Sequence, residues 1–155
     1  MDTKTTRTPR GLRNNNPLNI RRSAAKWKGL KKVVTDAQFC QFETMALGWR
    51  AAFWLLTRTY YHKYRCTTIA SIITRWAPPG DGNATLSYIM RVEQLTGIDR
   101  KAQLGTPSYH QAPWLKVGLA MAIVENGTNV LDYFAMLDGW QMCRDEAVNG
   151  GVEPR

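Results

Sequence analysis

The stretch TMALGWRAAFWLLTRTY, residues 44–60, decides the fold class of this chain. Its apolar side chains recur at intervals of three and four residues, which is the spacing of one face of an α-helix. That face is wide and runs from Met45 to Tyr60, so we expect the helix to be largely buried. Thr44 stands directly before the apolar pattern and is a suitable N-cap.

Turn and proline signals after this segment mark the ends of further helices. Pro78 and Pro79 end one of them, because proline cannot continue a helix and disfavours helical backbone in the residue before it. Asn126 and Gly127 form a stop signal at the end of another. The expected helices span residues 68–76, 84–97, 113–125 and, as one or two segments, 130–137 and 140–147. The pattern predicts a mainly α-helical chain.

The residues before the long helix show no helical pattern. The run RNNNPLNI, residues 13–20, disfavours helix and strand, because Asn side chains compete for backbone hydrogen bonds and Pro17 fixes its φ angle. Short β-type stretches are expected around residues 27–30 and 33–42, with Phe39 and Phe42 pointing inward. This part predicts a small irregular or β lobe.

The composition indicates one globular domain, which we place at residues 13–148. The 155 residues are 44% hydrophobic, enough for a sizeable core. A flexible basic lead over residues 1–12 and a tail over residues 149–155 flank it. The longest apolar runs have six residues, far fewer than the ~20 that cross a bilayer, and residues 1–13 lack the apolar segment of a secretory signal. We therefore expect no membrane span and synthesis in the cytoplasm without a signal peptide.

Positive charge is concentrated near the N-terminus. Ten of the 21 Lys and Arg residues lie at or before Lys32, together with one acidic residue, Asp2, whereas the remaining 123 residues hold eleven of each sign. This segment favours anionic partners, which include nucleic acid, lipid head groups and the anionic polymers of a bacterial wall. A solvated basic arm that aids solubility explains the charge equally well.

The reactive residues point away from metal and cofactor chemistry. Cys40, Cys66 and Cys143 form no C-x-x-C pair, and His62 with Cys66 makes a weak metal signal, so we expect buried thiols, no metal site and no cofactor. Phosphate-binding loops and nucleophile elbows are absent from the sequence. The carboxylates, asparagines and aromatic residues that remain suit a polysaccharide ligand, whose glycosidic oxygen a carboxylic acid can protonate.

Several motifs resemble a family of small phage and prophage proteins that are described as virion structural proteins. The resemblance covers roughly residues 11–125. Its motifs are RNNNPLNI (13–20), WKGL (27–30), FCQFE (39–43), GWRA (48–51), RWAPP (75–79) and NATLSYI (83–89). It implies a phage or delivery-system origin and other virion proteins as partners.

A more distant resemblance is to lysozyme-like glucosaminidases and lytic transglycosylases. In these enzymes a helix that ends in a catalytic Glu precedes an Asn-rich turn, an aromatic strand and a Tyr-bearing segment. Residues 15–20, 39–42 and 84–88 are similar to the last three, but no such helix precedes them here. The segment WLKVGLAMAIVENG, residues 114–127, is similar to the missing helix. The resemblance implies a circularly permuted lysozyme-like fold that returns Glu125 to the side of Asn14, Asn15 and Asn16.

The resemblance makes Glu125 the general acid, at the C-terminal end of a buried helix where the helix dipole favours the protonated carboxyl. Hydrolysis requires a second carboxylate, for which Glu43 and Asp36 are candidates, whereas a lytic transglycosylase requires none. Capping of the long helix explains Glu43 as well, and a turn role explains Asp36. The candidate sugar-binding residues are Asn14, Asn15, Asn16, Tyr88, Trp76 and Trp27, the last as an exposed stacking surface.

Plain structural roles compete with sugar binding, namely loop hydrogen bonds for the asparagines and core packing for Tyr88 and Trp76. The preferred function is an enzyme that cleaves peptidoglycan glycan strands in the bacterial wall or from a virion. The alternative is a non-catalytic virion or wall-binding protein on the same fold. Nucleic-acid binding by residues 7–32 is a third interpretation, which is disfavoured because Trp27 is the one aromatic residue there.

Overall fold

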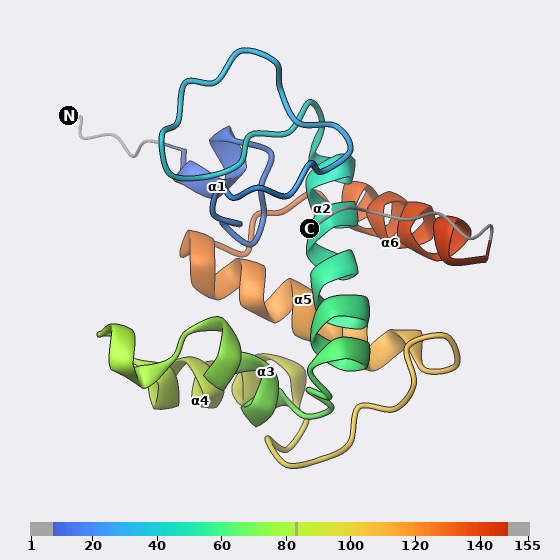
Figure 1. Cartoon of the computed structure of the whole chain (residues 1–155). Coiled ribbons are helices and arrows are strands. Elements are labelled where there is room, and N and C mark those ends of the chain that lie inside the picture. Colours follow the sequence, from blue (N-terminus) through green and yellow to red (C-terminus); the bar gives the residue numbers. More distant parts are fainter. Residues whose placement is uncertain (1–7, 83, 149–155) are drawn as a thin grey trace. The chain divides into compact units, whose positions relative to one another are not determined.

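The computed structural model describes residues 8–82 and 84–148 and confirms the mainly α-helical fold (Figure 1). The helical elements are α1 (Arg10–Arg13), α2 (Met45–Trp54), the π-helix η1 (Leu55–Lys63), α3 (Ile69–Trp76), the 3-10 helix η2 (Pro79–Asp81), α4 (Thr85–Thr96), α5 (Gln111–Asn126) and α6 (Tyr133–Val148). Between α1 and α2 the backbone pairs at two isolated antiparallel bridges, Arg21 with Phe39 and Leu30 with Phe42.

The boundaries of several elements differ from the expected ones: α5 begins at Gln111, and α6 is one helix from Tyr133 to Val148. The long helix continues to Lys63, and its last nine residues are π-helical. Residues 10–12, assigned to the flexible lead, form the start of α1. The expected β-type stretches contribute bridges and no continuous strand within residues 8–82. Residues 1–7 of the expected lead, and the expected tail, lie outside the described residues.

The described residues divide into two compact units. Residues 8–52 and 125–148 form one, which we call the terminal unit. The other, the inserted unit, is Phe53–Val124. The chain passes from the terminal unit into the inserted unit within the α2–η1 helix and returns near the end of α5.

In the terminal unit, α6 packs closely on the first turns of α2 (Figure 1). The contact is made at Gly139, where a Cβ atom would lie 2.7 Å from the carbonyl oxygen of Ala46 and 2.8 Å from the amide nitrogen of Arg50. Glu146 of α6 forms ion pairs with the buried Arg50 and with Lys28, whose Nζ is 3.0 Å from Oε2. These pairs hold the pKa of Glu146 below its usual value.

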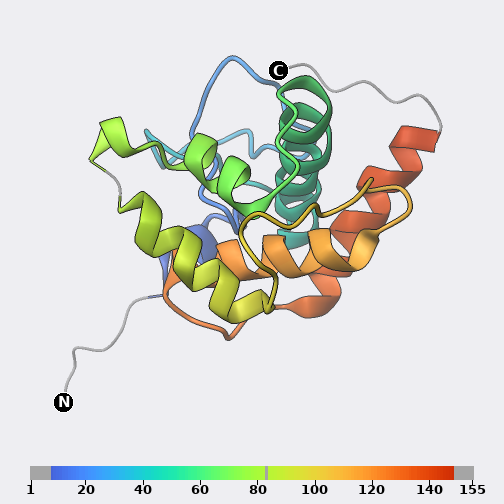
Figure 2. The ribbon, with the colours of Figure 1, turned by 90° about the horizontal axis from the view of Figure 1, so that it is seen from below.

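In the inserted unit, α3 begins with a capping box. Thr68 accepts a hydrogen bond from the amide of Ser71, and Ser71 accepts one from the amide of Thr68. The apolar face of α3 is fully buried at Ile69, Ile72 and Ile73. Figure 2 shows α4 (yellow-green) lying beside the inserted-unit part of α5 (orange), and the Tyr88 hydroxyl donates to the carbonyl of Met121 at 3.5 Å.

Candidate functional site

The RNNNPLNI motif forms a turn between α1 and the first bridge, which we call the asparagine turn (residues 14–20). Its backbone reverses tightly: the amide of Asn16 donates to the carbonyl of Gly11 at 2.8 Å. Asn15 and Asn19 have φ angles of 52° and 53°, in the left-handed region that Asn enters at lower cost than most other residues. The local conformation therefore explains the residue type at both positions.

Asn14 and Asn16 hold this turn together from inside. Asn16 is fully buried, donates to the carbonyls of Ile20 and Cys40 at 3.0 and 2.9 Å, and accepts from the amide of Ile20. Asn14 donates to Asp36 at 2.8 Å and accepts from the side chain of Gln41 at 3.1 Å. Both amides are thus occupied within the protein, as the loop-bonding alternative expected.

Asp36 is the polar centre of the lobe. Arg10 binds its carboxylate with two parallel hydrogen bonds of 2.8 Å, and the amides of Gln38 and Phe39 donate to it at 2.9 and 3.0 Å. These bonds, that of Arg10 first, hold the pKa of Asp36 far below its usual range. Its side chain is buried among donors, so the structure gives Asp36 an anchoring role and does not present it as a second carboxylate for sugar chemistry.

Asn15 joins the turn to the start of α2. Its side chain donates to the carbonyls of Phe42 and Glu43, at 3.1 and 3.4 Å. Gly48 of α2 lies so close to the carbonyl oxygen of Asn15 that a Cβ atom would overlap it. Glu43 itself is exposed, and its backbone amide donates to Gly29 at 2.8 Å. Glu43, one of the two predicted carboxylates, therefore lies in a segment whose backbone is bound by Asn15 of the turn.

Glu125, the other predicted carboxylate, contacts the same turn. It lies in the last turn of α5, is half-buried, and its Oε1 accepts a hydrogen bond from Asn19 Nδ2 at 3.2 Å. The neighbouring Asn126 is buried and donates to the carbonyl of Pro17 at 2.9 Å. The sequence places Asn14 to Asn16 beside this Glu, whereas the structure brings Asn19 to it.

The backbone of α1 completes this arrangement. A Cβ atom at Gly11 would lie 2.7 Å from the carbonyl oxygen of Asn16 and 2.9 Å from Asn19 Oδ1. A glycine is required there because the turn lies directly against the helix. We call Gly11, Asn19, Glu125 and Asn126 the Glu125 cluster; all four belong to the terminal unit.

Trp27 is not the exposed stacking surface that the sequence suggests. Its side chain is buried, with 5% of its surface exposed. The basic residues around it in the sequence misled the prediction, since their side chains reach solvent while the indole packs inward. The residue does not present a free aromatic face to a ligand.

Trp76 and Tyr88 belong to the inserted unit and are half-buried. The ring of Trp76 lies 6.2 Å from that of Tyr60, and the hydroxyl of Tyr88 is used within the unit. Both side chains take part in packing, which the sequence offered as their alternative role.

Sequence reasoning missed three residues of this region. Arg10 was assigned to the flexible lead, and Asn19 and Asn126 were noted only as parts of turn motifs. A signal existed for Asn19, because a second Asn four residues after Asn15, on the other side of Pro17, suggests another left-handed position. No local pattern indicates that Arg10 reaches Asp36, since 26 residues separate them.

The remaining reactive groups form no further centre. Cys40, Cys66 and Cys143 are buried and form no disulfide, and burial raises the pKa of Cys40 and Cys66. Among the described residues, no three His, Cys, Asp or Glu side chains gather as metal ligands would. No helix in the described ranges is both long enough and apolar enough to cross a bilayer.

Comparison with known proteins identifies a relative over most of the chain. No protein-family model matches the chain. Protein P5 of Pseudoalteromonas phage PM2 is 40% identical to it over 135 residues, which are 85% of this chain and 80% of P5. The similarity thus extends over most of both proteins.

Proposed function

Since the chain belongs to the family of protein P5 of phage PM2, we propose that it is a phage enzyme that cleaves the glycan strands of bacterial peptidoglycan. The observation that carries the proposal is the hydrogen bond from Asn19 to the carboxyl group of Glu125. It joins the Asn-rich turn to the end of a helix, the two parts that the lysozyme-like resemblance requires to meet. They meet although 106 residues separate them in the sequence.

In this proposal Glu125 acts as the general acid. It transfers a proton to the glycosidic oxygen as the bond from that oxygen to the sugar C1 breaks. The bond from Asn19 Nδ2 to Oε1 orients the carboxyl group, and the proton is delivered from Oε2. The half-buried position of Glu125 limits its contact with water.

The order of these parts supports a circular permutation. In the lysozyme-like enzymes the helix that carries the acid precedes the turn, whereas here α5 follows it by about a hundred residues. Permutation is tolerated where the original chain ends lie close together. We propose that the acid-bearing helix, which precedes the turn in those enzymes, lies at the end of the inserted unit here.

Glu43 is the candidate second carboxylate. The turn that binds Glu125 through Asn19 also binds the backbone of Glu43 through Asn15. If a water molecule replaces the leaving sugar, Glu43 would serve as base or nucleophile. If the sugar's own hydroxyl attacks C1, that hydroxyl returns its proton to the Glu125 carboxylate and Glu43 is not needed.

The basic N-terminal segment supports action at the wall. Residues 1–32 carry a net charge of +9, which attracts the protein to the anionic polymers of a bacterial envelope. A phage must pass this layer to deliver its genome, so we place the protein in the virion, in contact with other virion proteins.

The decisive experiment incubates purified protein with insoluble peptidoglycan and identifies the released products by mass. We expect wild type to release glycan fragments and Glu125→Gln to reduce the rate at least about a hundredfold, as general-acid groups contribute. Glu43→Gln distinguishes the two routes: loss of activity indicates a hydrolase, and retained activity with anhydro products indicates a transglycosylase. Asp138→Asn, an exposed carboxylate of α6, is the matched control.

A non-catalytic virion or wall-binding protein is the second candidate. The observation in its favour is that Asn14 and Asn16, which belong to the most distinctive motif, are buried and occupied by protein contacts. Hydrogen bonds of this kind give the motif a role in folding that requires no catalysis. Wild-type protein that binds several wall types and cleaves none would favour this candidate over the enzyme.

A further inference from the structure

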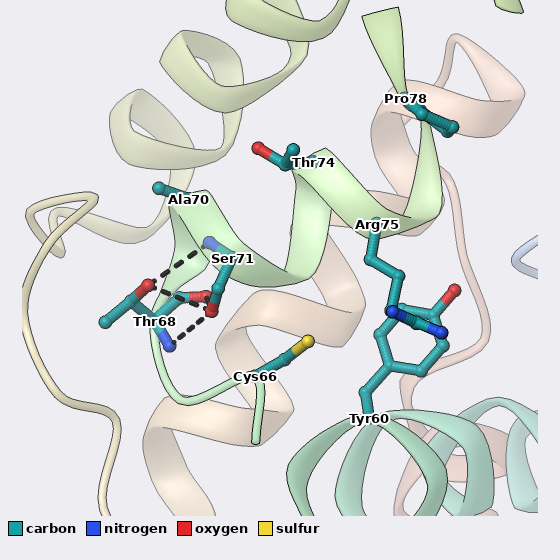
Figure 3. Close-up of a pocket in the computed structure, with 8 residues that line it drawn as sticks. All are labelled: Tyr60, Cys66, Thr68, Ala70, Ser71, Thr74, Arg75 and Pro78. Atoms are coloured by element: carbon teal, nitrogen blue, oxygen red, sulfur yellow. Dashed lines mark hydrogen bonds between the residues drawn. The ribbon is translucent and has the colours of Figure 1, made fainter. Parts of the chain in front are cut away.

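The inserted unit contains a surface groove that the proposed catalytic site does not use. Its volume is about 880 Å³, and it lies between the end of η1 and the exposed face of α3 (Figure 3). The α3 residues that line it, among them Ser71, Thr74 and Arg75, recur at the spacing of one helix face. The opposite face of α3 carries the buried isoleucines, so the groove is the polar side of an amphipathic helix.

The groove combines hydroxyl groups with apolar surface and carries one charge. Hydroxyl groups line it at Tyr60, Thr68, Ser71 and Thr74, and Arg75 is the one charged residue among the lining side chains. Burial raises the pKa of Tyr60 to about 12, so its hydroxyl stays protonated and can both donate and accept. The lining contains no carboxylate that would repel an anion.

Arg75 is held in place by aromatic rings. Its guanidinium carbon lies 3.3 Å from the ring centroid of Tyr64 and 6.0 Å from that of Tyr60. Among the described side chains Arg75 forms no ion pair. A guanidinium that is stacked on a ring keeps its N–H edges available, and these match a carboxylate or a phosphate with two parallel bonds.

The whole inserted unit favours anions. Residues 53–124 carry eight Lys and Arg and three Asp and Glu, a net charge of +5. The net charge of residues 33–155 is zero and hides this excess, because residues 125–155 carry two basic and six acidic residues. Thr68 and Ser71 donate their hydroxyl groups within the capping box, so the groove offers the guanidinium, the hydroxyls of Tyr60 and Thr74 and a tyrosine ring. This set matches a ligand that is mostly uncharged sugar and bears a single acidic group at this point.

We propose that this groove is a second glycan-binding site, which recognises a carboxylate-bearing saccharide of peptidoglycan through Arg75. The proposal rests on the proposed substrate of the Glu125 cluster and adds an accessory site in the other unit. Polynucleotides are a poorer match, because strands that carry a phosphate at every unit are bound by tracks of several cations with stacked bases.

The test measures binding in the Glu125→Gln background, in which the ligand is not cleaved. The probe is the disaccharide tetrapeptide of peptidoglycan, and chitotetraose, which lacks carboxylates, is the neutral comparison. We expect the acidic probe to bind and Arg75→Gln to weaken it at least about tenfold, as loss of charged hydrogen bonds predicts. Thr74→Val, an exposed groove residue, should weaken it less, and Arg91→Gln on the exposed side of α4 should leave it unchanged.

Three outcomes would overturn the proposal: equal binding of the two probes, binding that Arg75→Gln and Thr74→Val leave unchanged, or binding of single-stranded DNA in preference to either saccharide. Circular dichroism of each variant verifies folding. The cleavage assay on wild-type protein reports on the Glu125 cluster separately. Cleavage without Arg75-dependent binding rejects the groove alone, whereas Arg75-dependent binding without cleavage rejects the enzyme alone.

Discussion

At the scale of single residues, the asparagines of the turn divide into two kinds. Asn14 and Asn16 are buried and bond to residues within 20–41 of the same lobe. Asn15 and Asn19 adopt positive φ angles and bond to residues 42–43, at the start of α2, and to the end of α5. The two outward-reaching asparagines are the ones that connect to Glu43 and Glu125. The four asparagines are the same residue type in the sequence. Their backbone conformation decides which of them bond to Glu43 and Glu125.

Asn19 is expected to be a positioning residue for Glu125. Asn19→Gly keeps the positive φ angle of 53° without strain and removes the side-chain hydrogen bond, so we expect cleavage to fall about tenfold or more while folding is retained. Asn19→Asp replaces the amide donor with a second carboxylate beside Glu125, so we expect cleavage to fall in this variant as well. Cleavage that is unchanged in both variants would show that the contact has no part in catalysis.

At the scale of elements, the close contact of α6 with α2 depends on Gly139. Helix propensity alone would favour alanine at this position, since alanine normally stabilises a helix relative to glycine by about 1 kcal/mol. A Cβ atom there would lie within 3 Å of backbone atoms of Ala46 and Arg50, which cannot move aside as side chains can. The helix pair therefore requires the weaker helix former.

Gly139→Ala is expected to destabilise the protein by about 1–3 kcal/mol despite its better helix propensity, because the two helices must separate. Urea denaturation followed by circular dichroism measures the change. Asp138→Ala, at the neighbouring exposed position of α6, is the control and should be neutral or slightly stabilising. A Gly139→Ala variant as stable as that control would contradict the packing described for α6.

Several helix ends were predictable from short local patterns. The helix expected from residue 68 is capped by Thr68, the one expected to reach residue 97 has Gly97 as its C-cap, and α5 ends at Asn126, where the stop signal stands. The change to π-helical geometry after Trp54 was not predictable, since its residues fit an α-helical pattern equally well. Burial of Trp27 was equally inaccessible, because it depends on parts of the chain distant in sequence.

At the scale of the whole molecule, acid stability follows from carboxylates that are paired in the folded state. Asp36, Glu93 and Glu146 all have lowered pKa values, each caused first by a hydrogen bond from an arginine. A lowered folded pKa stabilises the protein above the unfolded pKa of about 4, and that contribution is lost as the pH falls further. The molecule should therefore lose stability steeply below about pH 5.

Asp36→Asn tests this at the strongest of the three groups. We expect the variant to be less stable than wild type at pH 7 and to lose less stability between pH 5 and pH 2, because the titrating carboxylate is gone. Urea midpoints measured across this range give the comparison. Parallel curves for the variant and wild type would show that Asp36 does not govern acid unfolding.

No sequence pattern indicated that the chain divides into a terminal and an inserted unit. Charge counted along the whole chain placed the entire excess in the first 32 residues, because the acidic C-terminal part cancels the basic inserted unit. The resemblance predicts Glu125 beside Asn14, Asn15 and Asn16, whereas the contacting residue is Asn19, and no local pattern indicates that contact. Contacts between residues that lie a hundred positions apart are set by the fold as a whole.

The discontinuous terminal unit has a consequence for biosynthesis. The ribosome releases Asn19 early and Glu125 only after the whole inserted unit has been translated, so the nascent chain holds the turn without its carboxylate partner for most of its synthesis. The inserted unit, which is continuous in sequence, can fold first on the ribosome. The Glu125 cluster is therefore assembled last, when nearly all of the polypeptide has been made.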